Sequence, residues 1–259
     1  MELKRKTARR YFLLAAFLFA FSFAHAQTTL IIPQIVDGGA WLTTIALTNT
    51  SANQTVVSLS FFQETGSGAT MPWSLAFAEM NSAQAQAVVL RGGSTLLLHT
   101  VGNAPVATVG WGQLSETDSS APVVAYAIFT QRVAGRSDQD GTAPAAAAGS
   151  RILVPFNNTN GSVTSIAIAN PGSTNESIFV GIRTPFSTTQ PAAITLYPQG
   201  HTSFDFPTMF PVTATQSGLA EFYSTSGSFS ILALTFNSGA FTTAPTYHVT
   251  GPPIIILTP

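Results

Sequence analysis

The sequence predicts an all-β protein made of two tandem antiparallel β-sandwich domains of the immunoglobulin-like (Ig-like) type, related by internal duplication. The phrase TTIALTNTS at residues 43–51 returns as TSIAIANPGS at residues 164–173, an offset of 121 residues. Beyond Ala26, short apolar stretches alternate with turn residues and helical periodicity is almost lacking. That combination is typical of antiparallel sandwiches. A single barrel or solenoid would need shorter repeats.

The repeated phrase predicts a strand in each copy. Ile45 and Leu47 alternate with threonine and alanine in the first copy, as Ile166 and Ile168 alternate with serine and alanine in the second. Period two with branched residues indicates a strand with one buried face. Further pairs of segments match in the same order, from LIIPQIVDGG and ILVPFNNTNG to VVAYAIFTQR and SILALTFNSG. Each copy is therefore expected to supply about seven short strands.

The domain boundaries follow from the repeat and from composition. We expect a signal peptide at 1–26, a first β-sandwich repeat at 27–137, a linker at 138–150 and a second repeat at 151–259. The linker, DQDGTAPAAAAGS, is rich in alanine and glycine and almost lacks β-branched residues. Its shortness suggests two touching domains with limited freedom.

The N-terminal segment, residues 1–26, resembles a secretory signal. A basic start, MELKRKTARR, precedes the apolar run YFLLAAFLFAFSF and the small-x-small site AHA. The apolar run is shorter than the roughly 20 residues that span a bilayer. ARRYFLL also approximates a twin-arginine signal, but Ala8 and Leu14 depart from that consensus, so the general secretory route is favoured. A secreted, periplasmic or cell-surface protein is expected, without membrane insertion after cleavage.

Charge and cysteine content narrow the classes of partner. Once residues 1–26 are removed, five arginines face ten acidic residues, which leaves a net charge of −5 and no lysine. Nucleic acid and anionic membrane surfaces are bound by basic clusters, so neither is an expected partner. The partner is unknown, and a protein or a polysaccharide remains open. The chain has no cysteine, which excludes disulfides, thiol catalysis and cysteine-ligated zinc.

The two copies differ most in a stretch of about 15 additional residues in the first copy, which contains MPWSLAF. There Met71, Trp73, Leu75 and Phe77 alternate with smaller residues, which predicts an added strand or hairpin arm. These four side chains either cover the core or the second domain, or form an exposed arm that contacts a partner.

Several phrases resemble a family of uncharacterised exported bacterial proteins with one or more β-sandwich (Ig-like) repeats. They are IPQIVDGGAWLTTIALTNTS, LRGGSTLLL, VGWGQLS and VVAYAIFTQRVAGRSD, with VPFNNTNG and LTFNSGAFTTAP in the second copy. The resemblance implies duplication and export. It implies no reaction, ligand or site residue.

No catalytic, phosphate-binding or metal-binding motif stands out, so no catalytic residue, metal or cofactor is predicted. If the protein were an enzyme, the best residues would be His201, Asp205 and Glu221. On one strand, however, His201 and Asp205 would lie about 13 Å apart. Trp41 and Trp73 are candidates for an exposed sugar platform, whereas Trp111 lies in an apolar strand and is expected in the core.

The sequence therefore predicts an exported, non-enzymatic protein that acts as an interaction, adhesion or cell-envelope surface module. One alternative is a carbohydrate-binding module that uses Trp41 or Trp73. Another is a subunit of a larger extracellular assembly, with the arm at residues 71–77 as its contact. The final segment, GPPIIILTP, is either a last edge strand or a sticky tail.

Overall fold

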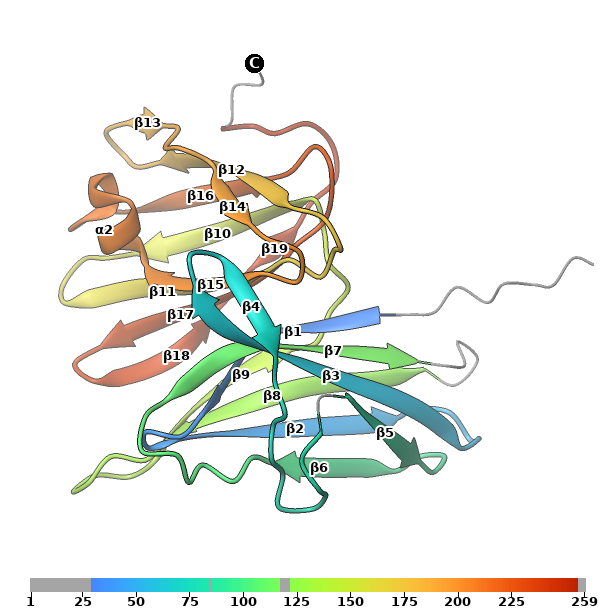
Figure 1. Ribbon diagram of the computed structural model, residues 1–259. Coiled ribbons are helices and arrows are strands. Elements are labelled where there is room, and N and C mark those ends of the chain that lie inside the picture. The colour runs from blue at the N-terminus through green and yellow to red at the C-terminus, as the bar shows by residue number, and fades with distance from the viewer. Residues whose placement is uncertain (1–28, 84, 117–121, 256–259) are drawn as a thin grey trace, which may run out of the picture.

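The computed structural model describes residues 29–83, 85–116 and 122–255 (Figure 1). The chain is all-β with 60% strand, and the described helical turns are the short α2 (Phe206–Met209) and η1 (Pro211–Thr213). The all-β prediction is confirmed. Among the described residues, no helix has the length and apolarity that crossing a bilayer requires. The predicted signal peptide lies outside the described residues.

The strands form four antiparallel sheets, numbered I to IV here. Sheet I has the order β1 (Thr29–Asp37), β7 (Thr108–Glu116), β3 (Thr55–Gly66) and β4 (Ala69–Pro72), and β5 (Ala85–Leu90) also pairs with β3. Sheet II has the order β6 (Thr95–His99), β2 (Trp41–Asn49), β8 (Val123–Gln131) and β9 (Gln139–Pro144). Both sheets belong to the first half of the chain.

The second half supplies sheets III and IV. Sheet III has the order β13 (Thr188–Thr189), β12 (Glu176–Arg183), β16 (Ser217–Tyr223), β10 (Arg151–Asn157) and β19 (Tyr247–His248), and β14 (Ile194–Leu196) also pairs with β12. Sheet IV has the order β15 (His201–Asp205), β11 (Ser162–Ala169), β17 (Ser230–Asn237) and β18 (Ala240–Ala244). The path β10–β16–β12 repeats β1–β7–β3, and β15–β11–β17–β18 repeats β6–β2–β8–β9. The repeat seen in the sequence is therefore present in the strand order.

The predicted arrangement of these strands is wrong. The four small sheets are arranged as a four-bladed β-propeller, not as two tandem Ig-like β-sandwich domains. Strand β1 of sheet I packs against β11 and β17 of sheet IV, and β9 of sheet II contacts β18 of sheet IV. The two halves of the chain therefore contact each other both through sheet faces and through edge strands. Alternating hydrophobicity shows that a strand has a buried face, but it does not show which sheet covers that face.

Three clusters of buried side chains hold the sheets together. The first draws mainly on sheets I and II but includes Ala167 and Leu232 of sheet IV. The second draws on sheets III and IV. The third joins Ile31, Phe62 and Trp111 of sheet I to Ala169 of sheet IV. The core therefore crosses the boundary between the two sequence repeats.

Residues 138–150, predicted as a linker, include the strand β9 and contribute Ala143 to the first cluster. Strand β9 pairs with β8 throughout its length, and Ala146 bridges to Ile31. Among the small residues of this segment, Gly141 and Ala143 are buried, whereas Ala147 is exposed. A Cβ on Gly141 would lie 2.5 Å from a ring carbon of Phe241, so only glycine fits this approach of the two halves.

Candidate functional site

A cavity lies where the two halves meet and is the candidate functional site. It has two parts, of about 310 and 190 Å³, which share Gln34 of β1 with Leu234 and Phe236 of β17. The larger part adds polar groups of sheet IV, and the smaller part adds Trp41 at the start of β2. We call the two parts together the junction cavity. Its walls come from strands far apart in the sequence, so the sequence alone does not locate it.

Aromatic rings from both halves form the apolar side of the junction cavity. Trp41 and Phe241 have ring centroids 5.4 Å apart, and Phe236 stacks on Phe241 at 5.5 Å. Trp41 follows a turn in which Gly39 has a φ of 56° and a Cβ would lie 2.5 Å from the amide nitrogen of Ala107. Glycine at this position therefore permits the turn that directs the chain into β2.

Polar side chains form the other side of the cavity. Ser165 on β11 donates a hydrogen bond to Asp205 on β15, and the Ser203 hydroxyl lies 3.5 Å from a carboxylate oxygen of Glu64. The Oε1 atom of Gln34 is buried and has no hydrogen-bond partner among the described residues.

A buried histidine ties the halves together beside the cavity. His201 is fully buried, with Nδ1 2.8 Å from Oε2 of Glu64 and Nε2 3.1 Å from the carbonyl oxygen of Pro33. Both ring nitrogens thus lie within hydrogen-bond distance of oxygens of the first half, whereas His201 belongs to the second. His201 therefore has a structural role across the junction.

Replacing His201 by alanine is expected to lower the free energy of unfolding by about 2–4 kcal/mol, because Glu64 and the Pro33 carbonyl then lose their buried partner. Chemical denaturation measures this loss. Ser203→Ala is the matched control on the same strand, and its effect should stay within about 0.5 kcal/mol because its contact with Glu64 is long. Equal losses in the two variants would contradict the assigned role.

The three residues considered for catalysis, His201, Asp205 and Glu221, do not form a common site. His201 is engaged with Glu64, and Asp205 accepts a hydrogen bond from Ser165. Glu221 lies on another sheet, where it pairs with Arg151. The three side chains therefore have different partners. Likewise, the described residues contain no group of three or more His, Cys, Asp or Glu side chains that could hold a metal ion.

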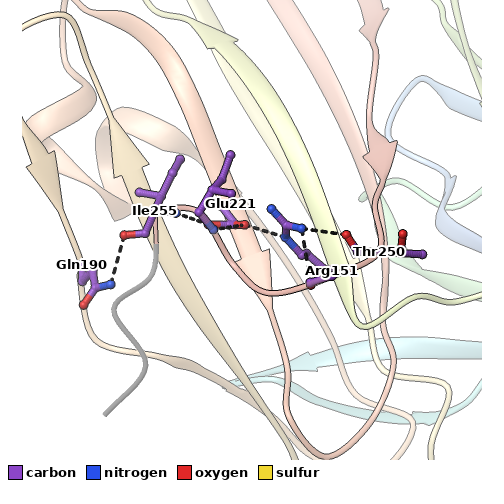
Figure 2. A network of polar contacts seen from close by, with 7 residues as sticks. Arg151, Gln190, Glu221, Thr250 and Ile255 are labelled. Carbon is purple, nitrogen blue, oxygen red and sulfur yellow. Dashed lines mark hydrogen bonds and ion pairs between the residues drawn. The ribbon is translucent and has the colours of Figure 1, made fainter.

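The Glu221 network anchors the C-terminal part of the chain (Figure 2). Nε of Arg151 donates to Glu221 at 2.7 Å, and both side chains are buried. The amides of Ile254 and Ile255 donate to Oε2 of Glu221 at 3.0 and 2.6 Å. Nη1 of Arg151 donates to the carbonyl of Thr250 at 3.0 Å. One ion pair thus binds the backbone of residues 250–255 at several points.

The predicted arm at residues 71–77 is mostly core. Trp73, Leu75 and Phe77 are buried in the first cluster, whereas Met71 is 51% exposed. The interpretation as an exposed arm therefore does not hold for three of these residues, because alternation places them against sheets I and II. The tip of the neighbouring hairpin contacts the second half, where the Thr70 hydroxyl donates to the carbonyl of Gln199 at 2.7 Å.

The tryptophans occupy three different environments. Trp73 is buried, so its ring offers no exposed platform for a sugar. Trp111 is fully buried, as expected, and its Nε1 donates to the carbonyl of Gln199 at 2.8 Å. Trp41 is half-buried and lines the junction cavity. Of the two predicted platform residues, Trp41 lines the junction cavity and Trp73 is buried in the first cluster.

No protein-family model and no curated protein matches this chain. The resemblance to exported bacterial repeat proteins therefore stays a prediction. What the site can bind is argued below from its geometry and chemistry.

Proposed function

We propose that the protein is exported and acts, without catalysis, as a binding module of the cell envelope or cell surface, with the junction cavity as its ligand site. Three features support this proposal: the signal-like N-terminal segment, the structural engagement of the candidate catalytic side chains, and a cavity built from both halves. A total cavity volume of several hundred Å³ is in the range of small-ligand sites.

The ligand class that best fits the cavity is a neutral saccharide unit. Sugar rings have an apolar face that packs on aromatic side chains and hydroxyls that need hydrogen-bond partners. Phe236 and Trp41 supply the aromatic side, and Gln34 and Asp205 supply acceptors. The Asp205 carboxylate beside this aromatic side carries the proposal, because an aliphatic ligand would leave the polar side of the cavity without hydrogen-bond partners.

Titration with soluble chito-, cello- and malto-oligosaccharides tests this function, followed by tryptophan fluorescence and isothermal titration calorimetry. At least one series should bind, and Phe236→Ala should weaken binding roughly tenfold, which corresponds to about 1.4 kcal/mol. Phe186→Ala is the matched control, because Phe186 is 85% exposed and does not line the cavity. Absence of binding by all three series, or equal affinities of the two variants, would refute the saccharide proposal.

A further inference from the structure

The internal repeat identifies an uncovered surface on sheet II. In this sheet, Ala46 of β2 lies directly between Leu97 of β6 and Tyr126 of β8. These three residues, together with Val124 two positions before Tyr126 on β8, are called the outer row and lie on the sheet face opposite Ile45 and Leu47. Leu97 is 44% and Tyr126 42% exposed, and the adjacent Val124 is 55% exposed. Ala46 itself is fully buried, whereas Leu97, Val124 and Tyr126 form an exposed apolar strip on this face.

The equivalent row in the second half is covered. In sheet IV, Ala167 lies directly between Ser203 and Leu232, as Ala46 lies between Leu97 and Tyr126. Ala167 and Leu232 are each 4% exposed and belong to the first core cluster. The first half covers them, because β1 of sheet I packs against β11 and β17. One copy of this face is therefore an interface within the molecule, whereas in the other copy the side chains that flank the central alanine, Leu97 and Tyr126, are exposed.

The complementary face is repeated as well. Sheet I contacts sheet IV with the face of β7 that carries Trp111, whose ring bonds to Gln199. On the same side of β7, Gln113 pairs with Ile31 of β1 and Ser60 of β3. In sheet III, Glu221 takes the place of Gln113 and pairs with Leu153 of β10 and Gly181 of β12.

On sheet III this face is occupied by residues 249–255, called the strap. After β19 pairs with the edge of β10, the strap passes Arg151 and Glu221 and reaches Gln190, whose side chain donates to the carbonyl of Ile255 at 3.2 Å (Figure 2). Ile255 itself is 3% exposed. The strap thus covers the surface that, in the first half, binds the next repeat.

We propose that the outer row of sheet II is a docking surface for sheet III of a second copy of this chain, and that the strap blocks this contact until it is displaced. The contact would repeat between molecules the packing of sheet I on sheet IV within one molecule. Because the two surfaces differ, the contact is heterologous and leads to head-to-tail chains. The strap then has the role of a terminal cap in a repeat protein.

The contact between sheets I and IV within one molecule indicates which surface would bind the outer row. The face equivalent to the outer row already binds a β1–β7–β3 surface, and the chain holds one further copy of that surface, β10–β16–β12. The strap is held by backbone hydrogen bonds to the Arg151–Glu221 pair, by the amide of Val249 on the carbonyl of Arg151, by Gln190 and by the side chain of Ile255. It can therefore leave without breaking a strand of sheet III, because β19 ends at His248.

Sedimentation velocity of the chain from residue 27, over a wide range of concentration, tests this proposal. The intact protein should be monomeric, and a variant that ends at residue 248 should associate so that its weight-average mass at least doubles. Val124→Asp in the shortened chain should abolish association, whereas Val106→Asp, at a 72% exposed position outside the outer row, should leave it unchanged. A synthetic peptide of residues 246–255 should reverse it.

A second variant keeps the test decisive if the shortened chain does not fold. Ile255→Asp loosens the strap and leaves Arg151 and Glu221 in place, and it should produce the same association, sensitive to Val124→Asp. A folded strap variant that stays monomeric would overturn the proposal. Association that Val124→Asp does not change would also overturn the proposal, because such association would come from the exposed face of sheet III and not from the outer row. Association of the intact protein through the outer row would overturn the capping role of the strap.

Discussion

Replacing Glu221 by alanine is expected to lower the free energy of unfolding by about 3–5 kcal/mol, the range found when one partner of a buried ion pair is removed. The Arg151 guanidinium would remain buried without its counterion, and the amides of Ile254 and Ile255 would lose their acceptor. For a chain of this size, such a loss lowers the melting temperature by roughly 10 °C. Differential scanning calorimetry measures the change.

Two controls test whether the loss of stability in Glu221→Ala comes from the buried ion pair with Arg151. Glu79→Ala changes the same residue type at a more exposed pair, with His99, and should cost less than about 1 kcal/mol. The double variant Arg151→Met/Glu221→Leu replaces both charges by apolar groups and should recover part of the stability, because no unpaired charge remains. If Glu221→Ala were no more destabilising than Glu79→Ala, the Glu221 network would not hold the strap.

Replacing Trp111 by alanine is expected to have a comparable effect, a loss of about 3–5 kcal/mol, because a fully buried indole leaves a large cavity. The ring stacks on Phe62 with centroids 4.5 Å apart, and its Nε1 bonds to the carbonyl of Gln199 in the second half. The variant should therefore also weaken the coupling of the halves. We expect its calorimetric transition to broaden or split, whereas the wild type unfolds in one transition.

Trp111→Phe isolates the hydrogen bond from the packing. Phenylalanine keeps most of the ring contact with Phe62, so its expected loss is about 1–2 kcal/mol, and a single unfolding transition should remain. Two separate transitions already in the wild type would contradict the view that one core joins the two halves.

Much of the local structure could be predicted from the sequence. The alternation around Ile45 and Ile166 predicts β2 and β11, and both lie at the centre of a four-stranded sheet. The alternation of Trp73, Leu75 and Phe77 likewise predicts three side chains on one face, and all three are buried. Alternation with period two is a local property of a strand, so it does not depend on which other sheet the strand packs against.

The packing of the halves could not be predicted in the same way. One signal was present in β17, where Ile231, Leu232, Ala233 and Leu234 form an unbroken apolar run. Such a run is typical of a strand buried on both faces. It indicated that sheet IV is covered on its second face, but only the tertiary structure identifies sheet I as the cover.

The site residues illustrate the same limit. Glu221 is one of the three residues that the sequence offers for catalysis if the protein were an enzyme. Its partners are Arg151, far earlier in the chain, and the amides of Ile254 and Ile255, close to the C-terminus. The sequence does not indicate a role for Gln34, because an amide side chain next to Pro33 is an ordinary polar position. Its importance depends on a cavity formed by sheet IV.

The most direct test of the account is a nuclear magnetic resonance titration of the labelled protein with the oligosaccharide series that binds. The account predicts that the largest shifts fall on the side-chain amide of Gln34 and on the backbone amides of Ser203 and Phe236, which line one cavity from both halves. Shifts confined to other surfaces, or no shifts at saturating sugar, would contradict the assignment of the junction cavity as the binding site.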